Sequence, residues 1–285
     1  DELGIPVTVS VSTDYNTIVE AMASKQVDVG FLPPNAYVLA NEQSNVKVLL
    51  QAQRYGIKGE NMEELMRQLE EVVYTPGVSG REKPIAALLA KKYAPYCDEI
   101  IYDNLGSIYA VIRSERPAAP KVLVSAHMDE AGFFVKKIEA NGLIRGLIMG
   151  KIEVNSLLGQ EVRLITRSGE KYFGVVLGID KDNHGKSQKD EVLLDFGFST
   201  KEVVLAEEIT LGDMVTFAPK MKETSNGQAW IASNWNGRIN VSQTIDLVKA
   251  MAAASVKLPY DLMIGCTVQE QVGTRGAQTA ANVTV

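Results

Sequence analysis

The stretch Lys121-Val-Leu-Val-Ser-Ala-His127-Met-Asp129-Glu130 joins an apolar segment directly to a histidine and two carboxylates. Its apolar run, residues 122–124, predicts a buried β-strand. In open α/β sheets, ligands bind beyond the carboxyl ends of the strands. The stretch therefore predicts an α/β protein with a functional site at this strand end.

The spacing of His127 and Asp129 suits a metal ligand with a supporting carboxylate. An imidazole that ligates a metal needs a neighbour that fixes its surroundings, and a carboxylate two residues later can provide this. Two residues in this spacing are a weak signal by themselves, and a hydrogen-bonded loop histidine is the alternative. His184 is the only other histidine, and we expect it in an exposed loop over 181–186.

A second polar cluster follows another predicted strand, which covers residues 260–268. It reads Gln269-Glu270-Gln271-Val-Gly273-Thr-Arg-Gly276, and its glycines allow the backbone to turn closely. Glu270 is a candidate general base, because a carboxylate near a cation can take a proton from a water that the cation has acidified. A solvated glutamate at a strand end is the alternative for Glu270 taken alone.

The surrounding pattern predicts the other elements of an α/β domain. Residues 62–73 carry apolar side chains on one helical face, and Thr75-Pro76-Gly77 ends that helix. Ser79 and Glu82 have the spacing of a capping box for a helix that runs to about Tyr93. Further strands are expected over 99–103, 107–113 and 121–126, and a further helix over 239–254.

The region 132–225 has a different pattern. Short apolar stretches alternate with turn signals at Asn141-Gly142, Ser168-Gly169 and Asn226-Gly227. This alternation predicts a small β-barrel or sandwich inserted into the α/β domain, which then comprises residues 62–131 and 226–285. The expected strands of the insertion cover 162–166, 172–178, 192–196 and 214–218.

The N-terminal 57 residues form a pattern of their own. Strand and helix periodicities predict a β-α-β-α-β run over 5–52, and such a βαβ fragment suits a parallel sheet. Residues 53–61 lose this periodicity and contain Gly56 and Gly59, so we expect a linker with the junction at 58–61.

Composition and charge argue against several function classes. The formal net charge of −6 disfavours nucleic-acid binding, and the 46% hydrophobic and 22% charged residues suit a globular chain with a sizeable core. The apolar runs are far shorter than the ~20 residues of a membrane-spanning helix, so no membrane partner is expected. Cys97 and Cys266 lie far apart in the sequence, which favours a reducing, cytoplasmic setting.

Several motifs in order give residues 62–285 a specific resemblance to a known family. They are Pro76-Gly-Val-Ser-Gly80, Ser125-Ala-His-Met-Asp-Glu130, Gly212-Asp213, and the segments 235–238 and 269–277. In these motifs the chain resembles the glutamyl and deblocking aminopeptidase family of dinuclear metallopeptidases. The resemblance implies a metallopeptidase-type α/β domain with an inserted β-barrel domain, two divalent metal ions (zinc or cobalt), peptide substrates and a homo-oligomer. It also implies that His127 ligates a metal, that Asp129 orients this histidine or the site, and that Glu270 is the catalytic base.

Two positions depart from the family pattern. The chain has Asn236 where the family has an aspartate that bridges both metals, and Gln271 where the family has a metal-binding glutamate. The family's remaining aspartate and histidine ligands are expected beyond Val285. Two dications held close together need anionic ligands, so we expect weak or absent metal binding and impaired or absent activity.

Residues 1–57 resemble part of a phosphonate or phosphate-ester binding protein of ABC importers, through Gly4-Ile-Pro-Val7 and the segments 27–34 and 36–40. The resemblance implies that Asn35, Ala36 and Tyr37 offer backbone N–H groups to an anion at a helix start. A packed aromatic is the alternative interpretation of Tyr37. Because the two resemblances belong to different compartments, we interpret the chain as two gene fragments joined near 57–61. A phosphonate-binding module and a non-catalytic assembly subunit are the alternative functions.

Overall fold

The computed structural model describes Ser24 and residues 62–153, 156–181, 187–254 and 257–283, without the side chains of Met62 and 180–190. The chain divides into two units, Asp1–Lys58 and Gly59–Val285, and all the described helices and strands belong to the second. The predictions for the first unit fall outside the described residues, as does His184. They are the βαβ run and the candidate residues Asn35, Ala36 and Tyr37.

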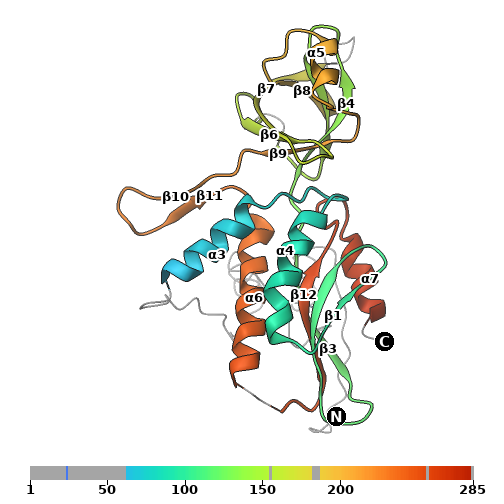
Figure 1. Cartoon of the computed structure of the whole chain (residues 1–285), viewed down its shortest axis with the longest axis vertical. Helices are drawn as coiled ribbons and strands as arrows, with labels where there is room; N and C mark the ends of the chain where they lie inside the picture. Colours follow the sequence, from blue (N-terminus) through green and yellow to red (C-terminus); the bar gives the residue numbers. More distant parts are fainter. Residues whose placement is uncertain (1–23, 25–61, 154–155, 182–186, 255–256, 284–285) are drawn as a thin grey trace. The chain divides into compact units, whose positions relative to one another are not determined.

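A mixed four-stranded sheet carries both predicted site strands (Figure 1). Its strands, in the order β1-β2-β12-β3, are Glu99–Tyr102, Ile108–Ile112, Asp261–Thr267 and Lys121–His127. The sequence pattern predicts all four to within one residue at each end. β12 runs antiparallel to β2 and parallel to β3, so the carboxyl ends of β3 and β12 meet at the same edge of the sheet.

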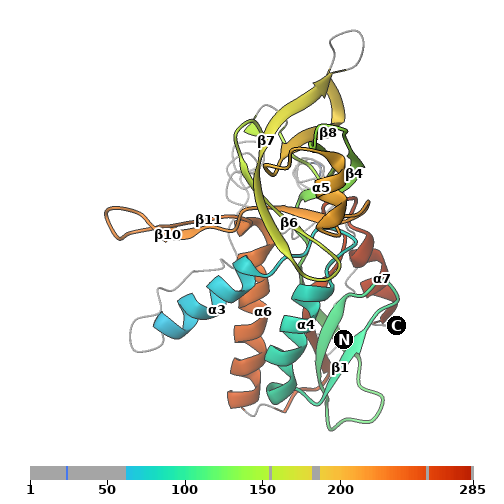
Figure 2. The ribbon, with the colours of Figure 1, turned by 45° about the horizontal axis from the view of Figure 1, so that its top comes forward.

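Helices cover both faces of this sheet. They are α3 (Met62–Tyr74), α4 (Lys83–Tyr93), the 3₁₀ turn η1 (Ala94–Tyr96), α6 (Trp235–Ala254) and α7 (Arg275–Val283). Ile108 and Ala110 of β2 pack with side chains of α4 and α6, whereas Tyr109 packs with Ala280 of α7. Successive side chains of a strand point to opposite faces. Therefore α7 lies across the sheet from α4 and α6, as Figures 1 and 2 show.

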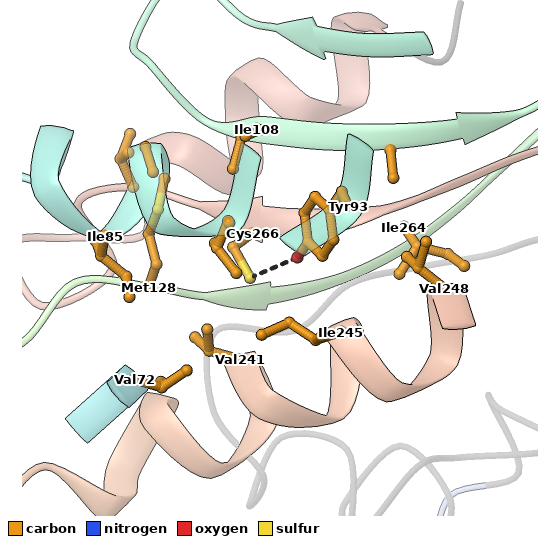
Figure 3. Close-up of a cluster of buried hydrophobic side chains, with 14 of the residues drawn as sticks. Val72, Ile85, Tyr93, Ile108, Met128, Val241, Ile245, Val248, Ile264 and Cys266 are labelled. Atoms are coloured by element: carbon orange, nitrogen blue, oxygen red, sulfur yellow. Dashed lines mark hydrogen bonds between the residues drawn. The ribbon is translucent and has the colours of Figure 1, made fainter. Parts of the chain in front are cut away.

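The main core lies between the sheet and helices α3, α4 and α6 (Figure 3). Its buried side chains include Val72, Ile85, Leu89, Ile108, Val241, Ile245, Val248 and Ile264. Among them, the Tyr93 hydroxyl lies 2.6 Å from Thr244 Oγ1 and 3.7 Å from Cys266 Sγ. Burial raises the pKa of Cys266 to about 11 and that of Tyr93 well above its ordinary value. Both groups therefore stay neutral, and this core carries polar atoms without charge.

Replacing Tyr93 with phenylalanine is expected to lower the free energy of unfolding by about 1 kcal/mol. The variant keeps the ring but leaves the buried Thr244 hydroxyl without this partner, and a hydrogen bond contributes about that much. Urea denaturation measures the change, with Tyr102→Phe as the matched control, because Tyr102 is 55% exposed. Equal stability of the two variants would contradict a structural role for the Tyr93 hydroxyl.

The inserted region forms a closed antiparallel barrel rather than a sandwich, with strand order β4-β5-β8-β7-β6-β9. In chain order, β4 to β9 cover Gly132–Ile138, Ile144–Met149, Glu161–Ile165, Lys171–Lys181, Ser187–Asp195 and Met214–Phe217. Alternate side chains, such as Val162 and Leu164 of β6, fill the interior. The short helix α5 (Lys201–Ala206) adds Val204 to this second core, and Thr200 caps its N-terminus.

The sequence pattern does not predict several of the elements. They are the barrel strands β4 and β5, the helices α5 and α7, and the strands β10 (Met221–Glu223) and β11 (Trp230–Ala232), although Asn226-Gly227 between β10 and β11 is a turn signal. Helix α6 begins at Trp235, before the predicted start, but Asn236 and Gly237 have non-helical backbone angles. Within the described part of the chain, no helix combines the length and apolarity that crossing a membrane requires.

Candidate active site

His127 is the last residue of β3 and lies beside Thr267, the last residue of β12. Its Nδ1 lies 3.2 Å from the carbonyl oxygen of Asp129, and its Nε2 lies 3.2 Å from Oδ1 of Asn236. Burial by itself lowers the pKa of His127, but hydrogen bonding to Asp129 and the charge of that carboxylate outweigh it. The pKa of His127 therefore lies above its ordinary value.

Asp129 joins the loops that follow the two strands. Its buried carboxylate accepts hydrogen bonds from Ser79 Oγ at 2.5 Å and from the backbone N–H groups of Glu270 and Gln271, each at 3.0 Å. Burial alone would raise the pKa of Asp129, but hydrogen bonds from His127, Ser79 and these two N–H groups hold it below its ordinary value. The carboxylate is thus ionised, and it fixes Glu270 and Gln271 near the end of β3.

The loop with Glu270 and Gln271 begins at Gln269, whose φ of +56° lies in the left-handed region. The N–H of Gln269 donates to Oε1 of Glu82 at 3.1 Å. Glu270 and Gln271 are both half-buried, and the charge of Glu270 is among the causes that raise the pKa of His127. The sequence-predicted residues His127, Asp129 and Glu270 therefore lie at one edge of the sheet.

Ser79 and Glu82 do not form the predicted capping box. Glu82 itself is the N-cap residue of α4 and makes no side-chain cap, while Ser79 donates to Asp129. The Glu82 carboxylate instead accepts from the N–H groups of Gly80 and Gln269. Both side chains thus support the site loops, and the only sequence signal for this was the resemblance motif that contains Ser79.

Asn236 belongs to a turn that precedes the regular part of α6. Asn234 and Gly237 have φ of +59° and +88°, and Asn236 has ψ of 116°. A Cβ atom at Gly237 would lie 2.6 Å from Cε1 of His127, so only glycine lets the turn approach the imidazole this closely. The turn therefore borders the site on one side, and the ends of β3 and β12 border it on the other.

Replacing Gly237 with alanine is expected to cost about 1–2 kcal/mol for the left-handed backbone and to displace the His127 ring as well. Gly159→Ala is the matched control, because Gly159 also has a positive φ, +76°, but a Cβ there meets nothing within 4 Å. Thermal unfolding and the imidazole NMR signals of both variants check this. If Gly237→Ala leaves the His127 signals unchanged, as the control does, the inference that Gly237 packs closely on the ring is wrong.

The donor groups at this edge do not fit a pair of divalent ions. They are the imidazole of His127, the carboxylate of Glu270 and the amide side chains of Asn236 and Gln271, while Asp129 already accepts hydrogen bonds from Ser79 and from the N–H groups of Glu270 and Gln271. Two dications need several anionic ligands to offset repulsion and lost hydration, and an amide oxygen cannot bridge as a carboxylate does. Among the described residues, no group of three or more His, Cys, Asp or Glu side chains could hold a metal.

Comparisons with known proteins agree with the resemblance of residues 62–285. The sequence profile of the M42 glutamyl aminopeptidase family matches residues 106–284. The lysyl aminopeptidase of Pyrococcus furiosus is 30% identical over 221 residues, which cover 75% of this chain and 61% of that protein. The glutamyl aminopeptidase of Lactococcus lactis is 28% identical over 224 residues, which cover 76% of this chain and 62% of that protein. The chain thus spans about three fifths of the length of these curated relatives.

Solved structures show the same fold. A TET aminopeptidase from a marine sediment archaeon of the Thaumarchaeota aligns with a TM-score of 0.70 and 26% identity, over 79% of this chain and 64% of that one. An aminopeptidase of Desulfurococcus kamchatkensis aligns with a TM-score of 0.68 and 28% identity, over 78% of this chain and 60% of that one.

The N-terminal part matches a different profile, that of phosphonate periplasmic substrate-binding proteins of ABC transporters, over residues 1–76. This match extends past the predicted junction at 58–61. The peptidase profile covers more than half of the chain, and a solved relative aligns with 79% of it. The chain therefore belongs to the M42 glutamyl aminopeptidase family and is homologous to the metallo-aminopeptidases of that family.

Proposed function

We propose that this chain derives from an enzyme that removes N-terminal residues from peptides with the help of divalent metal, and that the chain itself retains little of this activity. The observation that carries the proposal is the pair of hydrogen bonds that Asp129 accepts from the N–H groups of Glu270 and Gln271. These bonds hold both residues near the strand end that carries His127. The named relatives are aminopeptidases, which supports peptides as the substrate class.

In this proposal each charged residue has one role. His127 is a metal ligand, and Asp129 orients it, because the aspartate occupies the Nδ1 side of the ring and leaves Nε2 facing Asn236. Glu270 is the general base, which takes a proton from the attacking water onto its half-buried carboxylate.

We expect this chain to bind zinc or cobalt weakly. Asn236 and Gln271 place neutral amides where a pair of ions needs charge, and such a loss of anionic ligands lowers affinity. The family implies a dinuclear site, but the donors of this chain do not support one.

Hydrolysis of amino-acid p-nitroanilides tests the proposed role of Glu270. With added Co²⁺, we expect a slow release of p-nitroaniline by this chain that the Glu270→Gln variant lacks. The variant keeps the backbone N–H that donates a hydrogen bond to Asp129, so we expect it to fold to the same extent as the parent chain. Circular dichroism checks this. Equal rates for the chain and the variant would contradict the assignment of the base.

We further propose a cytoplasmic homo-oligomer. A TET1 peptidase that is 25% identical and aligns with a TM-score of 0.65 is described as a dodecamer in its crystal. A non-catalytic subunit of such an assembly is the alternative if hydrolysis is absent. The separated Cys97 and Cys266, both free, support a reducing compartment.

A second candidate function rests on the profile match over residues 1–76. We propose that residues 1–57 come from a phosphonate-binding protein, with Asn35, Ala36 and Tyr37 as the anion-binding residues, and that they were joined to the peptidase part at 58–61. Calorimetric titration with a small phosphonate tests this, and no heat of binding would contradict a retained binding function.

A further inference from the structure

Glu130 is a buried carboxylate that holds three segments together. It is 3% exposed and lies between the end of β3 and the start of β4. Its Oε1 accepts from the N–H of Gly77 at 2.8 Å and from Nη2 of Arg238 at 3.2 Å, and its Oε2 accepts from Nδ2 of Asn234. Its own N–H donates to the carbonyl oxygen of Gly77 at 2.9 Å.

Two of these partners flank the turn that contacts His127. Asn234 precedes Asn236 and Gly237, and Arg238 follows them directly. Arg238 is fully buried and also donates from Nη1 to the carbonyl oxygen of Val72 at 3.0 Å. One carboxylate therefore fixes both ends of the turn, and that carboxylate lies three residues after His127.

The buried ion pair of Glu130 and Arg238 is better explained as a device that fixes the positions of these segments than as a source of stability. Taking both charges out of water costs about as much as their attraction returns, so buried pairs rarely add net stability. Their best-supported use is to fix one arrangement among several. Here the arrangement includes a left-handed Gly237 against the imidazole and Asn236 Oδ1 at 3.2 Å from Nε2.

We propose that Glu130 is a positioning residue, which through Asn234 and Arg238 holds the 234–238 turn against His127. The inference concerns the placement of side chains, so it holds or fails independently of the proposed peptidase activity.

An exchange of groups between Glu130 and Asn234 tests the proposal. Asn234→Asp places a second carboxylate against Glu130, so it is expected to push the turn away from His127. Adding Glu130→Gln in the same chain again pairs one amide with one carboxylate, now with the amide at position 130 and the carboxylate at position 234. This double variant is expected to bring the turn back against His127. Glu130→Ala, which removes all three contacts, is the second disrupting variant.

Long-range ¹H–¹⁵N spectra of the histidine rings, recorded without metal at one fixed pH, report the result. The chain has two histidines, so His184→Gln assigns the His127 signals. We expect these signals to shift in Asn234→Asp and to return in the double variant. Tyr93→Phe, which loses a buried hydrogen bond to a residue outside the turn, is expected to leave them in place.

The positions of the His127 signals decide whether Glu130 positions the turn or only stabilises the fold. If Asn234→Asp and Glu130→Ala fold and lower the melting temperature but leave the His127 signals as in the parent, Glu130 does not position the turn. If Glu130→Ala fails to fold, Asn234→Asp and the double variant still give the answer, because Asn234 is only partly buried. Failure of the double variant to return the signals would also overturn the proposal.

Discussion

The Asp129→Ala variant is expected to lose about 3–4 kcal/mol of its free energy of unfolding. The substitution leaves the hydroxyl of Ser79 and the N–H groups of Glu270 and Gln271 without their acceptor in a buried place. Each such loss costs roughly 1 kcal/mol or more, and breaking a buried charged contact costs about 3–5 kcal/mol in all. Urea denaturation of the parent and the variant measures the difference.

Asp103→Ala is the matched control for this prediction. Asp103 likewise accepts several hydrogen bonds, from the backbone N–H groups of Leu105, Gly106 and Ser107, each at 2.9 Å, and from Oγ1 of Thr279 at 2.6 Å, but it is half-buried and lies in another loop. Water can reach those groups after the substitution, so a smaller loss of about 1 kcal/mol is expected. Equal losses in the two variants would contradict the special cost of the buried Asp129.

The same prediction has a pH dependence whose sign follows from the pKa of Asp129. That pKa is lower in the folded chain than its usual value of about 3.9, since hydrogen bonds outweigh burial. A carboxyl group of this kind adds stability above its unfolded pKa and loses the contribution as the pH falls through its folded pKa. The difference between parent and Asp129→Ala is therefore expected to shrink below about pH 4, and a growing difference in acid would contradict this.

Restoring two carboxylates with Asn236→Asp and Gln271→Glu is expected to raise the affinity for Zn²⁺ by about 100-fold. Asn236 Oδ1 lies 3.2 Å from His127 Nε2, and the backbone N–H of Gln271 donates to Asp129, so both substitutions add negative charge at the edge of the sheet that carries His127. Opposite unit charges in contact near a protein surface attract by several kcal/mol, and 100-fold corresponds to about 2.7 kcal/mol. Competition with a fluorescent zinc chelator measures the affinity.

Asn226→Asp with Gln228→Glu is the control, because it adds the same two charges in the exposed turn between β10 and β11. We expect this control to leave zinc affinity within about twofold of the parent, since distant exposed charges are screened by salt. A similar rise in both double variants would mean that net charge, and not the site, governs binding.

The fold could largely be predicted from the sequence because its strands carry local signals. Buried β2 and β12 read as short apolar runs between turn residues, and β3 ends in the polar cluster at His127. Helix α7 was not predicted, since its nine residues are mostly Ala, Gln, Thr and Asn and include few large apolar side chains, and only Gly276 and Ala280 are buried. Such a short helix depends on packing against the sheet for its stability.

The sequence predicts which candidate residues lie near strand ends, but it does not predict contacts between distant segments. His127 ends β3, and Asp129 and Glu270 lie two and three residues beyond the ends of β3 and β12, so the sheet brings these candidate residues together. Ser79 has a spacing that favours a cap, but Asp129, 50 residues later in the chain, takes its hydroxyl instead. Glu130 likewise meets Gly77, Asn234 and Arg238 across 53, 104 and 108 residues, and no pattern within one segment reveals such contacts.

Metal content of the parent chain tests the central claim most directly. The chain is dialysed against Zn²⁺ or Co²⁺, then against metal-free buffer, and the bound ions are counted by elemental analysis. Because Asn236 and Gln271 are neutral, the account predicts well under one tightly bound ion per chain. Retention of close to two ions per chain would contradict it and would show that the residues at this sheet edge, as they stand, build a dinuclear centre.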